Sequence, residues 1–348
     1  MLTMKNIDIK LTEYSHGAGC GCKISPMLLD EILKTTSREP LFEQLLVGNE
    51  HKDDAAAYDL GNGTSVLSTT DFFMPIVDDP FTFGRIAATN ALSDIYAMGG
   101  KPLMAISIFG WPIDKLSSEV ATAVIDGGRD ACREANIPLA GGHSIDSPEP
   151  IFGLAVTGLV ENKNLMKNSS ATEDCYIFLT KPLGIGILTT AQKQKKIEAN
   201  DIEVAIKAMT TLNSIGAKFA KLDGVVTMTD ITGFGLLGHL CEVCEASDIS
   251  ARVWFEKVPL LANVQKYREL GCIAGGTRKN FISYGHKISP MNEAQKEILC
   301  DAQTSGGLLV FVKKASLDEF MKVAKENNLF LEPIGKTMAK GNFLVEVL

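Results

Sequence analysis

The stretch Ala-Thr-Asn-Ala-Leu-Ser-Asp-Ile-Tyr-Ala-Met-Gly-Gly, residues 88–100, decides the fold of this chain. Apolar residues recur through it at helical spacing, and its glycine pair is a typical helix C-cap. We expect a helix from about Pro80 to Met98. Asp94 lies inside the apolar pattern, where aspartate is a poor choice unless its charge is needed. The stretch therefore predicts a helix that carries a functional carboxylate.

Strands and helices alternate on both sides of this helix. In the first half we expect strands at 66–70, 103–109 and 151–160, a helix at 117–135, and a strand-to-loop passage at 138–144. A polar segment at 162–174 marks a domain boundary. The second half restarts with a strand at 176–180, a long helical stretch at 201–219, and apolar runs at 225–229 and 308–312. The pattern predicts an α/β (α+β) fold of two related domains.

We divide the chain into three parts. Residues 1–50 hold a glycine-rich loop and one amphipathic helix over about 26–34, residues 51–165 form an N-terminal domain, and residues 166–348 form a C-terminal domain. A length of 348 residues exceeds what one hydrophobic core usually supports, which agrees with two domains.

Composition excludes several classes of function. The net charge of -8 argues against a nucleic-acid binder with a broad basic face. No run of apolar residues is long enough to span a membrane, and the N-terminus does not read as a secretory signal. Eight cysteines without an export signal indicate free thiols in a reducing compartment. We expect a cytoplasmic protein with no nucleic-acid or membrane partner.

Aspartates recur at strand ends and beside glycines, at Asp53, Asp54, Asp71, Asp94 and Asp230. Mg²⁺ prefers oxygen ligands and is usually held by a few carboxylates together with phosphates and water. Each aspartate alone could equally be a helix cap or a turn residue. The set predicts a magnesium site only if the fold gathers them.

The N-terminal segment Gly19-Cys20-Gly21-Cys22-Lys23 combines two thiols with a cation. Its glycines permit positive φ and close approach of a ligand. A lysine here can act as a point charge for phosphate oxygens and can lower the pKa of a nearby thiol. We expect Cys20 to be a nucleophilic thiolate and Lys23 to contact phosphate. The alternative is a loop with incidental cysteines.

Two further glycine motifs are weak candidates for phosphate contact. Gly142, His143 and Ser144 follow an apolar strand and could present backbone amides to phosphate or base, and 181–186 is a similar loop. Neither matches the Walker pattern, the dinucleotide fingerprint or a protein-kinase signature. A bound nucleotide would therefore need another architecture.

Cys241 and Cys244 form a Cys-x-x-Cys that could pair with Cys20 and Cys22 as a zinc site or act as a redox couple. Leucines and a valine at helical spacing surround them, which favours small core residues in a helix.

Together these motifs resemble the selenophosphate synthetase (selenide, water dikinase) family. The shared blocks run in order from about residue 14 to residue 310 and include Gly-Cys-Gly-Cys-Lys, Lys-Asp-Asp-Ala-Ala, Ser-Thr-Thr-Asp-Phe-Phe, Gly-Gly-His-Ser, Asp-Ile-Thr-Gly-Phe-Gly and Gln-Thr-Ser-Gly-Gly. Several blocks are shared with the wider group of aminoimidazole ribonucleotide synthetase-like proteins, whereas the opening block is much more specific.

The resemblance implies a two-domain aminoimidazole ribonucleotide synthetase-like fold. It also implies synthesis of selenophosphate from ATP, selenide and water, with AMP and orthophosphate as the other products. Carried over by position, Cys20 is the reactive cysteine and Lys23 the essential phosphate-contacting lysine. The implied magnesium ligands are Asp54, Asp94 and Asp230, and the implied nucleotide contacts are Lys23, His51, Lys52, Asp53, Asp71, Asp94, Gly142, His143 and Ser144.

The resemblance further implies a homodimer with nucleotide sites at its interface and a flexible N-terminal loop that acts as a lid. K⁺ is a further candidate cofactor, and a selenium-delivery protein is a candidate partner. Two alternatives remain open. Another ATP enzyme on this scaffold, acting on a purine precursor, would not need Cys20. A thiol or metal carrier without enzymatic activity would leave the aspartates without a role.

Overall fold

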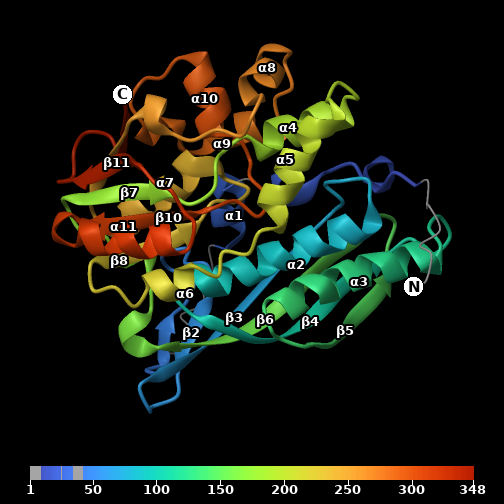
Figure 1. Cartoon of the computed structure of the whole chain (residues 1–348), viewed down its shortest axis with the longest axis horizontal. Helices are drawn as coiled ribbons and strands as arrows, with labels where there is room; N and C mark the ends of the chain where they lie inside the picture. The colour runs from blue at the N-terminus through green and yellow to red at the C-terminus, as the bar shows by residue number, and fades with distance from the viewer. Residues whose placement is uncertain (1–8, 25, 34–41) are drawn as a thin grey trace.

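The computed structural model describes residues 9–24, 26–33 and 42–348 and contains two six-stranded sheets (Figure 1). The first sheet lies below the second in the view of Figure 1. Most strand pairs are antiparallel, and the parallel pairs are β4–β5 and β9–β12. The predicted two-part α/β (α+β) architecture is confirmed.

The first sheet has the strand order β1-β2-β3-β6-β4-β5. Its strands are β1 (Leu45–Val47), β2 (Ala56–Asp59), β3 (Thr64–Phe73), β4 (Lys101–Trp111), β5 (Leu139–Asp146) and β6 (Ile151–Glu161). The apolar run of β6 lies between β3 and β4, where strand neighbours on both sides satisfy its backbone. The sheet therefore places the end of β3 near its middle and β5 at its edge.

Helices α2 (Pro80–Ala97) and α3 (Ser118–Glu134) cover one face of this sheet (Figure 1). Asp79 caps α2 by accepting the Thr82 N–H, Pro80 is in the first turn, and Gly99 follows at positive φ. The two helices touch through glycine: a Cβ on Gly127 would lie 1.9 Å from the Phe81 carbonyl oxygen. The predicted helix at 80–98 is confirmed, and it is buried nearly along its whole length.

The opposite face of the first sheet is apolar and exposed. Its strands carry the exposed apolar side chains Tyr58, Phe72, Leu103, Met104, Ile106 and Ile145. Large apolar surface of this kind marks an interaction site more often than a free surface. We call it the open face.

The second sheet has the order β12-β9-β11-β7-β10-β8. Its strands are β7 (Cys175–Leu179), β8 (Val225–Asp230), β9 (Ser250–Val253), β10 (Leu308–Lys313), β11 (Pro333–Met338) and β12 (Val345–Val347). Its helices are α4 (Ile185–Lys193), α5 (Ala199–Thr210), α6 (Gly216–Phe219), α7 (Gly235–Ala246), α8 (Val264–Glu269), α9 (Gly275–Tyr284), α10 (Glu293–Leu299) and α11 (Leu317–Glu326). α2 reaches across to contact α5, α6 and β8, so the two domains share a core.

Three details differ from the sequence expectations. The passage at 138–144 is a full strand, β5, because it pairs in parallel with β4. The helical stretch at 201–219 is broken between α5 and α6, where the Asn213 amide donates to Ser93 Oγ and to the Gly306 carbonyl. Asp71 lies within β3 rather than after it.

The N-terminal segment crosses the domain boundary. It contains two short 3₁₀ helices, Leu11–Tyr14 and Gly19–Cys22, followed by α1 (Pro26–Leu33), which confirms the predicted helix. Gly19 N–H donates to the Met74 carbonyl of the first domain, and Cys20 N–H donates to Thr304 Oγ1 of the second. Parts of the expected unit 1–50 lie outside the described residues. Within the described part of the chain, no helix has the length and apolar character needed to cross a membrane.

Candidate active site

Three carboxylates meet between the two domains. Asp54 precedes β2, Asp94 lies in α2, and Asp230 ends β8. One oxygen from each lies within 4.8 Å of the others. Thr69 Oγ1 donates to Asp94 Oδ2 at 2.5 Å, and Thr229 Oγ1 donates to Asp54 Oδ1 at 3.0 Å. The fold thus gathers the three predicted magnesium ligands, from three separate parts of the chain.

The three carboxylates of this acid cluster lie so close together that their ionised forms are disfavoured. Burial and the neighbouring carboxylates raise the pKa values of Asp54 and Asp94 well above normal, and burial raises that of Asp230. Asp230 Oδ2 is buried and has no hydrogen-bond partner among the residues that the structure describes. Three carboxylates this close repel one another unless a cation or protons neutralise them. An all-oxygen donor set with one unpartnered oxygen fits a hard divalent cation such as Mg²⁺.

Lys23 lies beside this cluster. Its Nζ is 3.6 Å from Asp71 Oδ2 and 6.0 Å from the centroid of the Phe234 ring. Burial alone would lower the pKa of Lys23, but Asp71, Cys20, Asp94 and Asp230 raise it above its ordinary value. The ammonium is therefore charged at neutral pH, and the side chain keeps 36% exposure, so it can reach a ligand.

Cys20 differs from the sequence expectation of a thiolate. Its side chain is 1% exposed, and Sγ lies 3.2 Å from Asn90 Oδ1 as a donor. Burial, and then the charge of Asp71, raise its pKa well above normal, although Lys23 opposes this shift. The proximity of Lys23 is thus not enough to lower the pKa of Cys20, and the raised pKa favours the neutral thiol at neutral pH.

A cavity of about 470 Å³, here called the acid cavity, surrounds the cluster. Lys23, Lys52, Asp53, Asp71 and the three clustered aspartates line it, so the structure brings these predicted residues together. Asp53 Oδ1 also accepts the Asn168 N–H at 2.6 Å, which ties the 49–54 loop to the second domain. His51 is exposed and is not part of the lining; its carbonyl accepts from the Asn168 amide.

Within one chain, the acid cavity is not lined by the predicted nucleotide contacts Gly142, His143 and Ser144. They lie on the edge strand β5, separated from β3 by β6 and β4, and their residues are exposed. His143 pairs with Ile108 of β4 and so shares the open face with its neighbours there.

Sequence reasoning did not assign roles to Asn90, His239 and Glu242. Asn90 Nδ2 donates to Asp71 Oδ2 at 2.5 Å, while its Oδ1 accepts from Cys20 and from the Ser305 N–H. His239 and Glu242 line the acid cavity, with His239 Nδ1 3.2 Å from a Glu242 oxygen. The sequence could have indicated Asn90, because this residue lies one helical turn before Asp94 and therefore on the same face of the helix.

Cys241 and Cys244 are buried in α7 at 2% and 0% exposure. Within the described residues they form no metal-ligand group with Cys20 and Cys22. The packing interpretation is confirmed.

Comparison with known proteins first defines the class. Residues 52–160 match the AIR synthase related protein, N-terminal domain, and residues 172–347 match the AIR synthase related protein, C-terminal domain. Among solved structures, a thiamine-monophosphate kinase from Stenotrophomonas maltophilia has a TM-score of 0.64 at 18% identity, covering 88% of this chain and 91% of that one. A hydrogenase maturation protein HypE has a TM-score of 0.61 at 16% identity, covering 91% and 86%. These likenesses establish the fold.

Closer relatives then define the family. A selenide, water dikinase of Sulfurimonas denitrificans is 80% identical over 341 residues, covering 98% of this chain and 99% of the relative. That of Pasteurella multocida is 59% identical over 332 residues, covering 95% of each. The chain belongs to the selenide, water dikinase family.

Proposed function

We propose that this enzyme makes selenophosphate from ATP, selenide and water, with release of AMP and orthophosphate. The observation that carries the proposal is the acid cluster of Asp54, Asp94 and Asp230 beside the charged Lys23, under a segment that carries Cys20. Family membership supports the same reaction. A thiol carrier would leave the acid cluster without a role, and an enzyme for purine precursors would not need the cysteine segment.

Asp54, Asp94 and Asp230 would hold Mg²⁺, which when bound neutralises phosphate charge during phosphoryl transfer. The nucleotide phosphates would then face Lys23, whose ammonium acts as a point charge for phosphate oxygens. Lys52, Asp53 and Asp71 line the same cavity and are the proposed contacts for the rest of the nucleotide, together with His51.

In the first step, hydroselenide attacks the γ-phosphorus. A P–Se bond forms, the bond from the γ-phosphorus to the bridging oxygen breaks, and ADP leaves with the electron pair. Asp71 orients Lys23, and Asn90 fixes Asp71 by donating to it. In the second step, water cleaves ADP to AMP and orthophosphate. The N-terminal segment, seated on both domains, would act as a lid that excludes water from the first step.

We further propose a homodimer with nucleotide sites at its interface. The open face supplies apolar surface for it, and Gly142, His143 and Ser144 are exposed on that sheet. In a dimer they would contact nucleotide bound by the partner, which explains why they lie apart from their own acid cavity.

The cellular and ionic setting is part of the proposal. All eight cysteines are free thiols, in agreement with a reducing cytoplasm. A K⁺ requirement and a selenium-delivery protein remain predictions, and replacing K⁺ by Na⁺ in the assay tests the first.

The test is anaerobic phosphorus NMR of the enzyme with ATP and Mg²⁺, with and without selenide. We expect a selenium-bonded phosphate signal that appears in step with AMP and orthophosphate. ATP that stays intact, or is consumed without this product, would contradict the proposal and point to another acceptor.

A further inference from the structure

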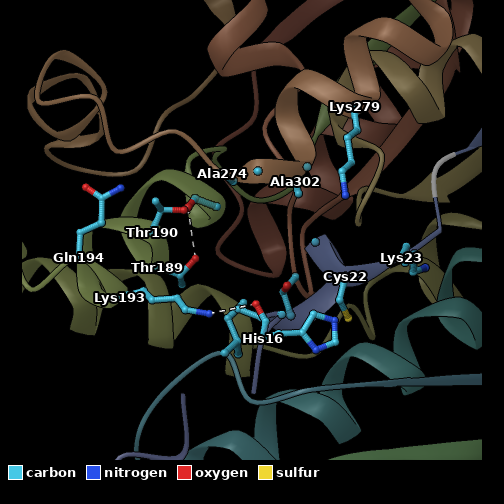
Figure 2. Close-up of a pocket in the computed structure, with 18 residues that line it drawn as sticks. His16, Cys22, Lys23, Thr189, Thr190, Lys193, Gln194, Ala274, Lys279 and Ala302 are labelled. Atoms are coloured by element: carbon cyan, nitrogen blue, oxygen red, sulfur yellow. Dashed lines mark hydrogen bonds between the residues drawn. The ribbon is translucent and has the colours of Figure 1, made fainter. Parts of the chain in front are cut away.

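A second cavity, of about 410 Å³, lies against the same N-terminal segment as the acid cavity. Figure 2 shows Lys193 and Lys279 reaching toward it from different walls, with His16 and Cys22 on the side of the N-terminal segment. We call it the lysine cavity. Lys23 lines both cavities, so the two lie on either side of this residue.

The two cavities have opposite charge. Among the described residues, the lining of the lysine cavity contains Lys23, Lys193 and Lys279 and no carboxylate. The acid cavity is lined by seven carboxylates: Glu50, Asp53, Asp54, Asp71, Asp94, Asp230 and Glu242. In a chain of net charge -8, a cavity whose described charged lining residues are all lysines is a departure from the average surface. It favours an anion.

Several groups in the lysine cavity are available to a ligand. Lys279 is exposed and has no ion pair among the described residues, while Lys193 Nζ donates to the His16 carbonyl at 3.3 Å. The Thr190 hydroxyl has no hydrogen-bond partner in the described part of the chain and lies one turn before Lys193 on the same face of α4. The first turn of α9 adds the backbone of Gly275 and Gly276, at the positive end of the helix dipole.

The N-terminal segment directs its two thiols differently. Cys20 is connected to the acid cavity, because its thiol donates to Asn90 and Asn90 donates to Asp71. Cys22 lines the lysine cavity. Gly21 is open here, since a Cβ on it would meet nothing closer than Ala302 at 3.7 Å. The lysine cavity is therefore cationic and is lined in part by Lys23, which also lines the proposed phosphate site.

We propose that the lysine cavity binds hydroselenide, a small monoanion, and presents it to Lys23 from the side opposite the acid cluster. This inference rests on the proposed function. Access through the acid cavity would bring the anion past seven carboxylates and past bound nucleotide. Access through the lysine cavity avoids both and leads to the ammonium that neutralises the phosphate under attack.

The sharpest test reverses the charge of the cavity without a clash. Gly275 is the first residue of α9, and no atom of the described part of the chain lies within 4 Å of where its Cβ would stand. Gly275→Asp adds a carboxylate that a helix N-terminus tolerates well, so the variant should fold. Gly275→Asn has nearly the same shape and measures the steric effect alone. Lys279→Gln removes a cation, and Lys207→Gln, at an exposed lysine of α5 outside both cavities, is the matched control.

The readout is anaerobic steady-state kinetics with selenide and ATP varied separately. We expect Gly275→Asp to raise the KM for selenide roughly fivefold to tenfold over Gly275→Asn, with less effect at high salt. Lys279→Gln should raise it in the same direction, while the KM for ATP changes little. Lys207→Gln should leave both unchanged.

Equal selenide KM values for the Asp and Asn variants would overturn the proposal, and so would a rise confined to the KM for ATP. Orthophosphate is another small anion of the reaction. If Gly275→Asp weakens inhibition by added orthophosphate while the selenide KM stays fixed, the cavity serves product and the proposal is wrong. Selenophosphate formation by the unaltered enzyme in the same assay separates these results from failure of the proposed function, with which the inference would also fall.

Discussion

At the scale of single residues, the site depends on a chain of contacts that begins at Asn90. Its amide bridges Cys20, Asp71 and Ser305, and Asp71 in turn lies beside Lys23. A side chain that is itself buried and makes three hydrogen bonds holds its neighbours in one arrangement. The positions of the reactive groups are therefore set by a residue that need not touch substrate.

Lys23→Ala should lower kcat about 100-fold to 1000-fold, because it removes a charge that the proposed transition state needs. Since Lys23 is partly exposed, the variant should keep its fold, which circular dichroism checks. Lys207→Ala, at an exposed lysine of α5, is the matched control. Near-full selenide-dependent activity of Lys23→Ala would refute the proposed role.

Cys20 should resist alkylation. Its thiol is buried, and burial followed by Asp71 raises its pKa, so little thiolate exists at pH 7.5. Cys22 is partly exposed, and its pKa is raised as well, mainly by burial. With iodoacetamide and no substrates, mass spectrometry should find Cys22 modified before Cys20. Faster labelling of Cys20 would show that the segment opens readily or that the thiol is activated.

The acid cluster predicts a pH effect on stability. The folded-state pKa values of Asp54, Asp94 and Asp230 are raised, so the metal-free protein loses stability as pH rises above the unfolded value near 4 through those raised values. Mg²⁺ displaces the protons, so its stabilising effect should grow with pH. Urea unfolding from pH 5 to 8, with and without Mg²⁺, measures this. Asp54→Asn should flatten both trends, and a Mg²⁺ effect that falls with pH would contradict the assignment.

Residue-level prediction from sequence succeeded where a residue was out of place locally. Asp94 was identifiable because a carboxylate inside an apolar helix needs a reason. The state of Cys20 was not predictable, because its pKa depends on burial and on the charge of Asp71, and both arise only in the folded chain.

At the scale of elements, α2 is the support of the site. It carries Asn90 and Asp94 on one face and packs against α3 on another, so its position determines where both functional side chains lie. Its first turn is fixed by Asp79 and its close approach to α3 by glycine.

Gly127→Ala should therefore affect both stability and activity. The new methyl group would meet the Phe81 carbonyl and force α3 away from α2, at a cost of about 1–3 kcal/mol. The midpoint temperature of thermal unfolding and kcat should both fall. Gly341→Ala is the control, because a Cβ there would have no contact closer than 3.9 Å. Unchanged stability of Gly127→Ala would mean that the helices separate at little cost.

Element prediction worked for long periodic segments and failed at tertiary contacts. The pattern at 80–98 was sufficient for α2. By contrast, β5 forms through pairing with β4, and the break before α6 places Asn213 against Ser93, which no local pattern encodes.

At the scale of the whole molecule, the open face makes an oligomer testable. Ile106→Asp places a charge in this apolar surface and should weaken self-association by about 2 kcal/mol or more. Light scattering should show a shift to monomer, with activity lost in parallel if the sites lie at the interface. Phe330→Asp, at an exposed apolar residue of the second domain, should change neither. An unaltered mass for Ile106→Asp would place the interface elsewhere.

The contact between the N-terminal segment and the second domain affects when the site can form during synthesis of the chain. The Cys20 backbone is held by Thr304, and the third carboxylate of the cluster is Asp230. A nascent chain still on the ribosome cannot complete this arrangement until residue 304 has emerged. We therefore expect the chain to be inactive toward ATP during translation and to become active only when nearly all of its sequence has been made.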